Sequence, residues 1–420
     1  MMPILVLALK SLANRKVTAG LTVLAIAASV MLLLGVEKVR TEAKASFANT
    51  ISGTDLIVGA RSGATQLLLY SVFRIGNATN NISWSAFEDI ERHKDVAWAI
   101  PLSLGDSHRG YRVLGTSLDY FKHYRFGQKQ PLRFAAGEPF DDVFDAVLGA
   151  EVAEALGYKL GDSLIVTHGL GAEGFEKHEN TPFTVSGILA RTGTPVDRTV
   201  HVSLRGIEAM HLDWRDGARV PGLTHSADAI RAMVLQPRAV TAVLVGLKSR
   251  FATFAVQRTI NEYRGEPLLA ILPGVALQEL WDLMGTAEAA LSAISVMVVA
   301  TGVLGMLIML LAGLNERRRE MAILRSVGAR PAHLFGLLVA EAALLTLAGC
   351  LLGLALLYLG LVIAAPMVEA HYGLYLAIRA PTSWELTLLG VVMAAGVTAG
   401  AIPAWRASRQ SLADGMIVRG

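Results

Sequence analysis

Residues 17–36 read VTAGLTVLAIAASVMLLLGV, an apolar run without a single charged side chain. A helix needs about 20 apolar residues to cross the hydrocarbon core of a membrane, so this run predicts a spanning helix. Three further runs of the same kind, at 289–314, 342–368 and 386–405, lie in the C-terminal part of the chain. The sequence therefore predicts a membrane protein with four transmembrane α-helices, one plus three, and a large α+β extracytoplasmic domain inserted between spans 1 and 2.

The composition supports a membrane protein. Hydrophobic residues make up 53% of the chain, charged residues only 17%, and the mean hydropathy is +0.46. These values are too apolar for a soluble chain of this length. The net charge of +3 is small and the basic residues cluster near the ends of the spans, so we expect no nucleic-acid partner. The single cysteine, Cys350, falls inside the third span and is interpreted as a small apolar filler.

The arginines predict the orientation. The loop 315–333 carries five arginines and the tail 406–420 carries three, whereas the loop 369–385 carries one. The positive-inside rule therefore places the loop 315–333 and the tail in the cytoplasm, and the large domain on the other side. The first apolar run is longer than the core of a signal peptide, so we expect an uncleaved anchor.

The predicted segments follow from the spans and the orientation. In chain order they are a cytoplasmic amphipathic N-terminal segment (1–16), span 1 (17–36), the extracytoplasmic α+β domain ending in a stalk helix (37–286), span 2 (287–314), a cytoplasmic loop helix (315–333), span 3 (334–368), a short extracytoplasmic loop (369–385), span 4 (386–405) and a cytoplasmic tail (406–420).

The large domain contains both strand and helix patterns. Short runs rich in β-branched or aliphatic residues predict strands at 146–148, 163–167, 183–188, 200–203 and 241–247. Helical patterns are expected at 83–93, beginning at the capping residue Ser83, at 150–156, which Gly157 would end, and at 249–263, with Phe251, Phe254 and Ile260 at helical spacing. We expect two lobes, divided near residues 130 and 235.

A stalk is predicted directly before span 2. Leu277, Leu280, Trp281 and Met284 recur at helical spacing. The result would be a helix that runs without a break from the outer domain into the membrane. Such a helix would carry movement between the two.

The sequence contains no motif for nucleotide binding, hydrolytic catalysis or metal binding. The chain has no G-x-x-x-x-G-K-[ST] phosphate loop, no H-E-x-x-H and no G-x-S-x-G. Asp106, Ser107 and His108 are adjacent, but neighbours in sequence are not a triad, and a polar loop is favoured there. Eight of the ten histidines are scattered through the outer domain and are interpreted as surface histidines. A metal site in a loop, formed by His168 and His178, is the alternative. We expect no catalytic residue, no metal site and no cofactor in this chain.

The loop after span 2 has the sharpest pattern. Residues 315–331 read NERRREMAILRSVGARP. Met321, Leu324 and Val327 recur every three residues and predict a narrow apolar stripe on a short amphipathic helix, which Gly328 would end. Two interpretations stay open, namely an interfacial anchor held by arginines and a docking surface for a partner.

Span 3 holds a glycine pair and one carboxylate. Gly349 and Gly353 form a small-xxx-small pattern, which permits close helix contact within the chain or in a dimer. Glu341 lies early in the span, and a structural role near the arginine-rich end is favoured over a functional one.

These motifs carry a family resemblance. Residues 316–329, ERRREMAILRSVGA, resemble the E-x-R-R-E-I-x-x-L-R-x-x-G-A signature of the FtsX/MacB-type (type VII) ABC transporter permeases. The segments LVAEA at 338–342, PAWRAS at 403–408 and LGAE through LGD at 148–162 are similar to that family as well, as is the glycine pair. The one-plus-three layout extends the resemblance over all 420 residues.

The resemblance implies the partners and the site. A separate cytoplasmic ABC ATPase subunit would bind ATP and Mg, and the permease would pair with a second copy of itself or with a related permease. A periplasmic adaptor or a lipoprotein is a further expected partner. The residues implied to couple the permease to the ATPase are Glu316, Arg317, Arg318, Arg319, Glu320, Met321, Leu324, Arg325 and Gly328.

The resemblance also implies a function. The permease would transmit ATP-driven motion to its periplasmic domain at a bacterial inner membrane, for export or efflux of substrate from the periplasm. A lipoprotein-releasing permease is the alternative. The outer domain is too large for the cell-division type. A membrane-anchored metal sensor or enzyme would need converging histidines or a catalytic pocket, which the sequence does not predict.

Overall fold

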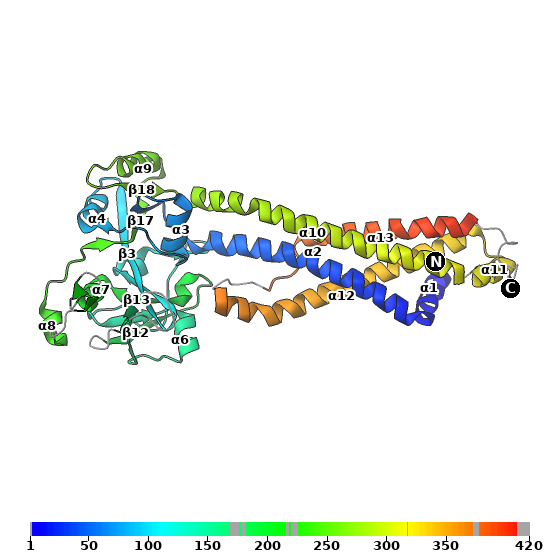
Figure 1. The fold of residues 1–420 in the computed structure, drawn as a ribbon, viewed down its shortest axis with the longest axis horizontal. Helices are drawn as coiled ribbons and strands as arrows, with labels where there is room; N and C mark the ends of the chain where they lie inside the picture. The colour runs from blue at the N-terminus through cyan, green and yellow to red at the C-terminus, as the bar shows by residue number, and fades with distance from the viewer. Residues whose placement is uncertain are drawn as a thin grey trace. The chain divides into compact units, whose positions relative to one another are not determined.

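The computed structural model describes residues 2–168, 176–177, 182–212, 214–215, 218–219, 226–316, 318–372 and 378–409. The chain forms two compact units (Figure 1). One is a helical unit built from 1–43, 285–371 and 376–420, and the other is a mixed unit built mainly from 44–284. Each is described by itself.

The helical unit contains the apolar runs. Its helices are α1 (Met2–Asn14), α2 (Lys16–Thr50), α10 (Pro273–Glu316), α11 (Arg318–Ser326), α12 (Pro331–Tyr372) and α13 (Ser383–Arg409), of which α2 and α10 also contribute to the mixed unit. Within the described part of the chain, four of them are long and apolar enough to cross a membrane, over Lys16–Glu42, Pro273–Ala312, Pro331–Val368 and Ser383–Ala407. The predicted fold class of four spans with a mixed domain between the first two is confirmed.

Two of these helices extend well past their apolar runs. Helix α10 has 44 residues and begins at Pro273, so the predicted stalk and span 2 are one uninterrupted helix. Helix α2 has 35 residues and continues to Thr50, although the sequence placed residues from 37 onward in the outer domain. Residues 37–50 contain no Gly or Pro and include several Ala, Glu and Lys, which favour helix.

The mixed unit is rich in strands. They are β1 (Leu56–Ala60), β2 (Ile82–Ser83), β3 (Val96–His108), β4 (Tyr111–Thr116), β5 (Arg125–Phe126), β6 (Gln130–Pro131), β7 (Phe134–Gly137), β8 (Asp145–Leu148), β9 (Ser163–Leu164), β10 (Thr167–His168), β11 (Glu176–Lys177), β12 (Phe183–Leu189), β13 (Thr199–Ser203), β14 (Trp214–Arg215), β15 (Ala218–Arg219), β16 (Ala239–Val240), β17 (Ala242–Leu247) and β18 (Leu268–Ile271).

Short helices accompany the strands. They are α3 (Ala64–Val72), α4 (Trp84–Glu91), α5 (Asp119–His123), α6 (Ala150–Leu156), α7 (Leu204–Met210), α8 (Ala227–Ala232) and α9 (Thr253–Asn261), with 3-10 turns η1 (Pro195–Arg198) and η2 (Arg250–Ala252). The predicted helix starts and stops at Ser83 and Gly157 are present. The Ser83 side chain accepts a hydrogen bond from the Ala86 N–H, and Gly157 ends α6 with a φ of 72°.

One main sheet organises the mixed unit. Its strand order is β18-β1-β17-β3-β4-β13-β8-β12-β7, with β9, β10 and β11 attached at its sides. The pairs β4–β13 and β8–β12 are parallel, and the others are antiparallel. The segment 130–235 supplies one half of this sheet. Because the sheet runs without a break through both halves, the expected division into two lobes is corrected.

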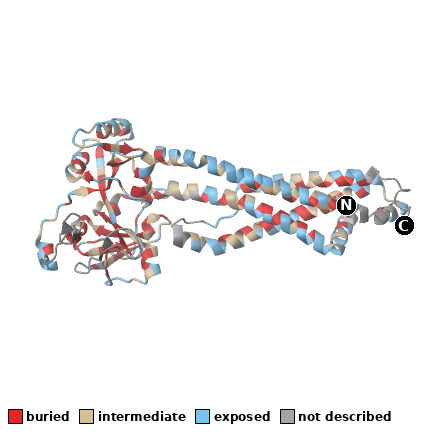
Figure 2. Ribbon diagram, in the orientation of Figure 1, coloured by how far each residue is buried: buried red, intermediate tan, exposed pale blue. Residues whose placement is uncertain are grey.

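Both faces of the sheet are buried. Ile57, Ile100 and Leu244 pack on one face with α3 and α5, whereas Val58 and Val243 pack on the other with α4 and α9. This alternation is the period of two that a strand imposes on its side chains. Figure 2 shows the buried residues gathered on these strands.

The expected helix at 249–263 is partly wrong. Phe251 and Phe254, expected on its apolar stripe, are exposed. Ile260 is buried as expected, together with Val256, because α9 begins at Thr253 and turns this i, i+4 pair toward the sheet.

Candidate functional site

The predicted cytoplasmic loop helix is α11, nine residues long. Its end has the geometry of a Schellman motif. The Ala329 N–H donates to the Leu324 carbonyl at 3.0 Å, and the Gly328 N–H donates to the Arg325 carbonyl at 3.0 Å. Gly328 has a φ of 101°, the left-handed region that favours glycine. This turn explains why the helix stops at the predicted glycine, and α12 starts at Pro331.

Helix α11 is anchored on the membrane helices of its own chain. Met321 is only 7% exposed and packs with Leu334 and Leu338 of α12 and with Ala404 and Ala407 of α13. Leu324 is partly buried against the same cluster. These two apolar residues therefore fix the position of α11 on the helical unit.

The predicted three-residue stripe is wrong at its last member. Val327 is 84% exposed, and Ile323 is 55% exposed. A helix turns by about 100° per residue, so residues spaced by three drift around it, and Val327 has rotated away from Met321. Ile323 and Val327 are four residues apart, which places them on a common side one turn apart. They form an apolar pair that faces away from the bundle.

The charged part of the predicted coupling segment is only partly described. Arg325 is half-buried. Arg317 lies outside the described residues, as do the side chains of Glu316, Arg318, Arg319 and Glu320.

The predicted stalk is joined by a second helix that the sequence analysis missed. The ring of Trp281 in α10 meets Phe47 in α2 at 5.4 Å between centroids, with an interplanar angle of 75°. The Lys44 ammonium lies 5.4 Å from the centre of the same indole. Leu277 packs on the core of the mixed unit, Leu280 is half-buried, and Met284 is exposed. The helix-forming composition of 37–50 was the signal for this second stalk.

The glycine pair of span 3 makes an intrachain contact. A Cβ placed on Gly353 would lie 2.6 Å from the Ala27 carbonyl oxygen of α2. A Cβ on Gly349 would lie 2.5 Å from Ile26 Cγ2, also in α2. The absence of side chains at these two positions lets α12 and α2 approach closely.

A buried ion pair links α2 to the start of α13. Lys38 Nζ lies 3.7 Å from Glu385 Oε1, and the two side chains are 4% and 5% exposed. Lys38 Nζ also donates to the Arg379 carbonyl at 3.2 Å. Thr382 and Glu385 cap α13 reciprocally, since the Glu385 N–H donates to Thr382 Oγ1 and the Thr382 N–H to Glu385 Oε2. The T-x-x-E pattern at 382–385 was the sequence signal for this cap.

The segment with triad-type residues is not the expected polar loop. Asp106, Ser107 and His108 end strand β3, so neighbours in this run point to alternate faces. Ser107 shares a hydrogen bond with Thr167, and His108 bonds the Ile165 carbonyl at 2.6 Å. Burial lowers the pKa of His108. These hydrogen bonds join the end of β3 to the neighbouring segment 165–167, as in an ordinary sheet.

No group of three His, Cys, Asp or Glu side chains that could hold a metal converges among the residues that the structure describes. Of the alternative loop site, His178 and the side chain of His168 lie outside the described part of the chain.

Two family models match the chain over different parts. The family described as the MacB-like periplasmic core domain matches residues 19–263, more than half of the chain. The family described as the FtsX-like permease C-terminal matches residues 292–412. The chain belongs to the FtsX/MacB-type ABC transporter permeases. This permease is therefore a multi-pass membrane component of an ABC transporter, and the resemblance seen in the sequence is confirmed.

The permease is also similar to two solved structures. One is the periplasmic region of MacB from Actinobacillus actinomycetemcomitans, with 11% identity, 55% of this chain and 94% of that chain covered, and a TM-score of 0.36. The other is the extracellular domain of the noncanonic ABC-type transporter YknZ from Gram-positive bacteria, with 13% identity, 52% and 99% covered, and a TM-score of 0.31. Among curated proteins, no match was found.

Proposed function

We propose that this permease couples ATP hydrolysis by a separate cytoplasmic ABC ATPase to movement of its outer domain, for export or efflux of substrate from the periplasm. The observation that supports this most is helix α11. It is anchored through Met321 yet presents Ile323 and Val327 away from the bundle. An exposed apolar pair at the C-terminal end of α11, on the side away from the buried Met321, suits a protein partner.

Two continuous helices would transmit the movement. Helix α10 has 44 residues, so it is about 66 Å long at 1.5 Å per residue. Its Trp281 and the Phe47 of α2 hold the two helices together where they enter the mixed unit. A displacement of α11 would act on the end of α10 directly, because only Arg317 separates the two helices in sequence. We further propose a bacterial inner membrane and a second permease copy as the setting.

Replacing the exposed apolar pair tests the proposed coupling. We expect the double variant Ile323→Asp/Val327→Asp to lose ATPase co-purification and coupled ATP turnover by at least about tenfold. Burying an unpaired carboxylate in an apolar contact weakens binding by about 1–3 kcal/mol or more. The measurement is co-purification with the cognate ATPase and ATP turnover of the complex in nanodiscs.

The matched control is Val234→Asp in the outer domain. Val234 is 97% exposed, so the same chemical change is made at an apolar residue that is even more open than Ile323 and Val327. We expect it to leave both readouts unchanged. Wild-type association in the double variant would show that α11 is an anchor only.

The proposed orientation can be tested by labelling. Cys350 is buried and replaceable by alanine, which gives a cysteine-free chain. In this background we expect a membrane-impermeant maleimide to reach Asn80→Cys and not Ser326→Cys in intact spheroplasts, because both positions are exposed in their own units. Ser186 is a poorer reporter, since it is half-buried and donates to the Ala146 carbonyl. The reverse labelling pattern would invert the proposed topology.

A further inference from the structure

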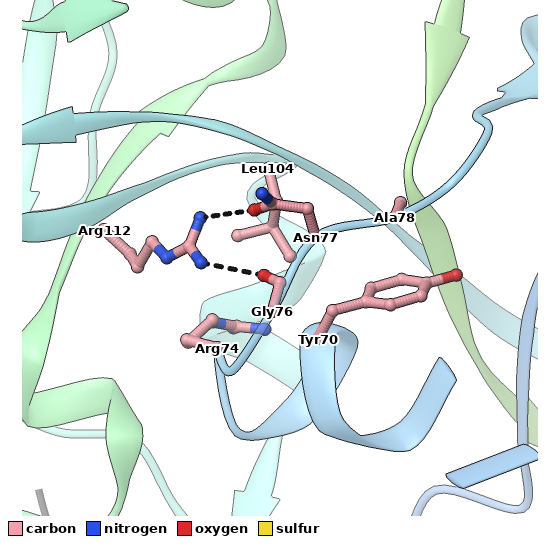
Figure 3. A pocket seen from close by; sticks show the side chains of 7 residues that line it. All are labelled: Tyr70, Arg74, Gly76, Asn77, Ala78, Leu104 and Arg112. Atoms are coloured by element: carbon pink, nitrogen blue, oxygen red, sulfur yellow. Dashed lines mark hydrogen bonds between the residues drawn. The ribbon is translucent and has the colours of Figure 1, made fainter. Parts of the chain in front are cut away.

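The outer domain has a small pocket next to the end of α3. Its lining includes Tyr70, Arg74, Asn77, Leu104 and Arg112. The pocket is shallow and opens to solvent, so a bound group would sit at its mouth. Figure 3 shows two arginines reaching this pocket, one from the turn after α3 and one from β4.

The two guanidinium groups have only neutral acceptors. Arg112 donates to Asn77 Oδ1 at 3.1 Å and to the Gly76 carbonyl at 2.8 Å, and both bonds are drawn in Figure 3. Arg74 donates to the Ser71 carbonyl. Within the described part of the chain, no carboxylate is paired with either arginine. Burial and the neighbouring charge of Arg74 lower the pKa of Arg112. Two like charges without a counter-charge favour an anion between them.

The backbone at Arg74 is unusual. Arg74 has a φ of 60°, in the left-handed region that non-glycine residues rarely adopt. Residues held in such a conformation cluster at binding sites, where the surrounding structure maintains them.

The inner edge of Arg74 lies in a buried polar region. Its Nε atom is buried without a hydrogen-bond partner among the described residues, and the same is true of Tyr120 Oη and His201 Nε2. The Tyr120 and His201 rings are 5.2 Å apart. His201 is neutral, because burial, followed by the nearby Arg74 charge, lowers its pKa to about 3. Its Nδ1–H donates to the Val147 carbonyl at 3.2 Å, which leaves Nε2 as an acceptor. Among the described residues that line the pocket, the two arginines therefore supply the positive charge.

We propose that this pocket binds a small anionic group, a carboxylate or a phosphate, between the guanidinium groups of Arg74 and Arg112. The planar fork of a guanidinium matches the two oxygens of such groups. Tyr70 and Leu104 supply an apolar wall for the carbon skeleton that carries the anion. The proposal does not depend on coupling to an ATPase.

Calorimetry of the full chain in neutral detergent tests the site. The probes are inorganic phosphate and acetate, titrated at constant ionic strength with chloride as the balancing ion. We expect saturable binding of at least one probe, weakened at least tenfold by Arg112→Gln. The matched control is Arg92→Gln, an exposed arginine directly after α4 that pairs with Glu88, which should bind like the wild type. No saturable binding, or equal affinity in both variants, would overturn the proposal.

Two further measurements complete the test. A cooperative thermal unfolding transition of Arg112→Gln would show that the variant is folded and that its loss of binding is local. If that variant does not fold, Arg112→Lys keeps the charge, and it should still weaken binding because it lacks the fork. Nanodiscs containing phosphatidic acid separate the sources of the anion. A lipid headgroup would lower the apparent phosphate affinity by competition, whereas a soluble anion would leave it unchanged.

Discussion

Replacing Gly353 by alanine is expected to destabilise the helical unit by about 1–3 kcal/mol, the usual cost of overpacking. The new Cβ would lie 2.6 Å from the Ala27 carbonyl oxygen and 2.9 Å from Val30 Cβ. A carbonyl oxygen belongs to the backbone of α2 and cannot rotate away, so the whole helix must shift. The measurement is the midpoint of thermal unfolding of the purified permease in detergent.

Two other glycines serve as comparisons for the loss of stability in Gly353→Ala. At Gly349 the nearest atoms are Cγ2 and Cβ of Ile26, at 2.5 Å and 2.7 Å, and this Cβ is fixed to the backbone of α2, so Gly349→Ala should be destabilising as well. At Gly390 of α13 a Cβ meets nothing within 4 Å. Gly390→Ala should be neutral or stabilising, since alanine favours helix over glycine by about 1 kcal/mol. Equal midpoints for Gly353→Ala and Gly390→Ala would show that α2 and α12 do not pack through Gly353.

The spans were predictable because a long apolar run has few alternatives. Each run is long enough to cross a membrane, and each lies within one of the four candidate spans except for a few terminal residues. The extent of α2 beyond residue 36 was not predicted, because the charged residues that follow mark the end of a span but not the end of a helix.

The strands of the mixed unit were predictable where a short run of β-branched or aliphatic residues is not interrupted. Strands β8, β12, β13 and β17 lie close to their predicted positions. The central strand β3 was missed because Pro101 and Gly105 interrupt its pattern. Its pairing with β4 also shifts register between Leu104 and Ser107, the irregularity expected near an inner glycine.

The candidate sites depend on contacts that sequence spacing does not encode. Met321 was identified on α11, but its burial against α12 and α13 depends on helix packing. The three-residue spacing then misplaced Val327, because a helix does not repeat every three residues. The arginine pocket joins the turn after α3 to β4, and neither segment carries a motif on its own.

Breaking the buried ion pair between α2 and α13 should have the largest effect of any single substitution considered. We expect Lys38→Met and Glu385→Gln each to lower stability by about 3–5 kcal/mol, since each leaves one buried charge without its partner. Glutamine keeps the acceptor that caps α13, so Glu385→Gln removes the charge without removing the cap. The measurement is the thermal midpoint, together with the yield of folded protein in the membrane.

The double variant separates the ion pair from the rest of the site. Lys38→Met/Glu385→Gln removes both charges, so its loss should be well below the sum of the two single losses. The matched control is Arg40→Met on the same helix, which pairs with Glu37 and Glu288 and is more exposed, at 42% for Arg40 and 16% and 18% for the two carboxylates. Exposed pairs of this kind contribute about 0–1 kcal/mol. Additive losses in the double variant, or a Lys38→Met loss no larger than that of Arg40→Met, would show that Lys38 and Glu385 do not join α2 to α13.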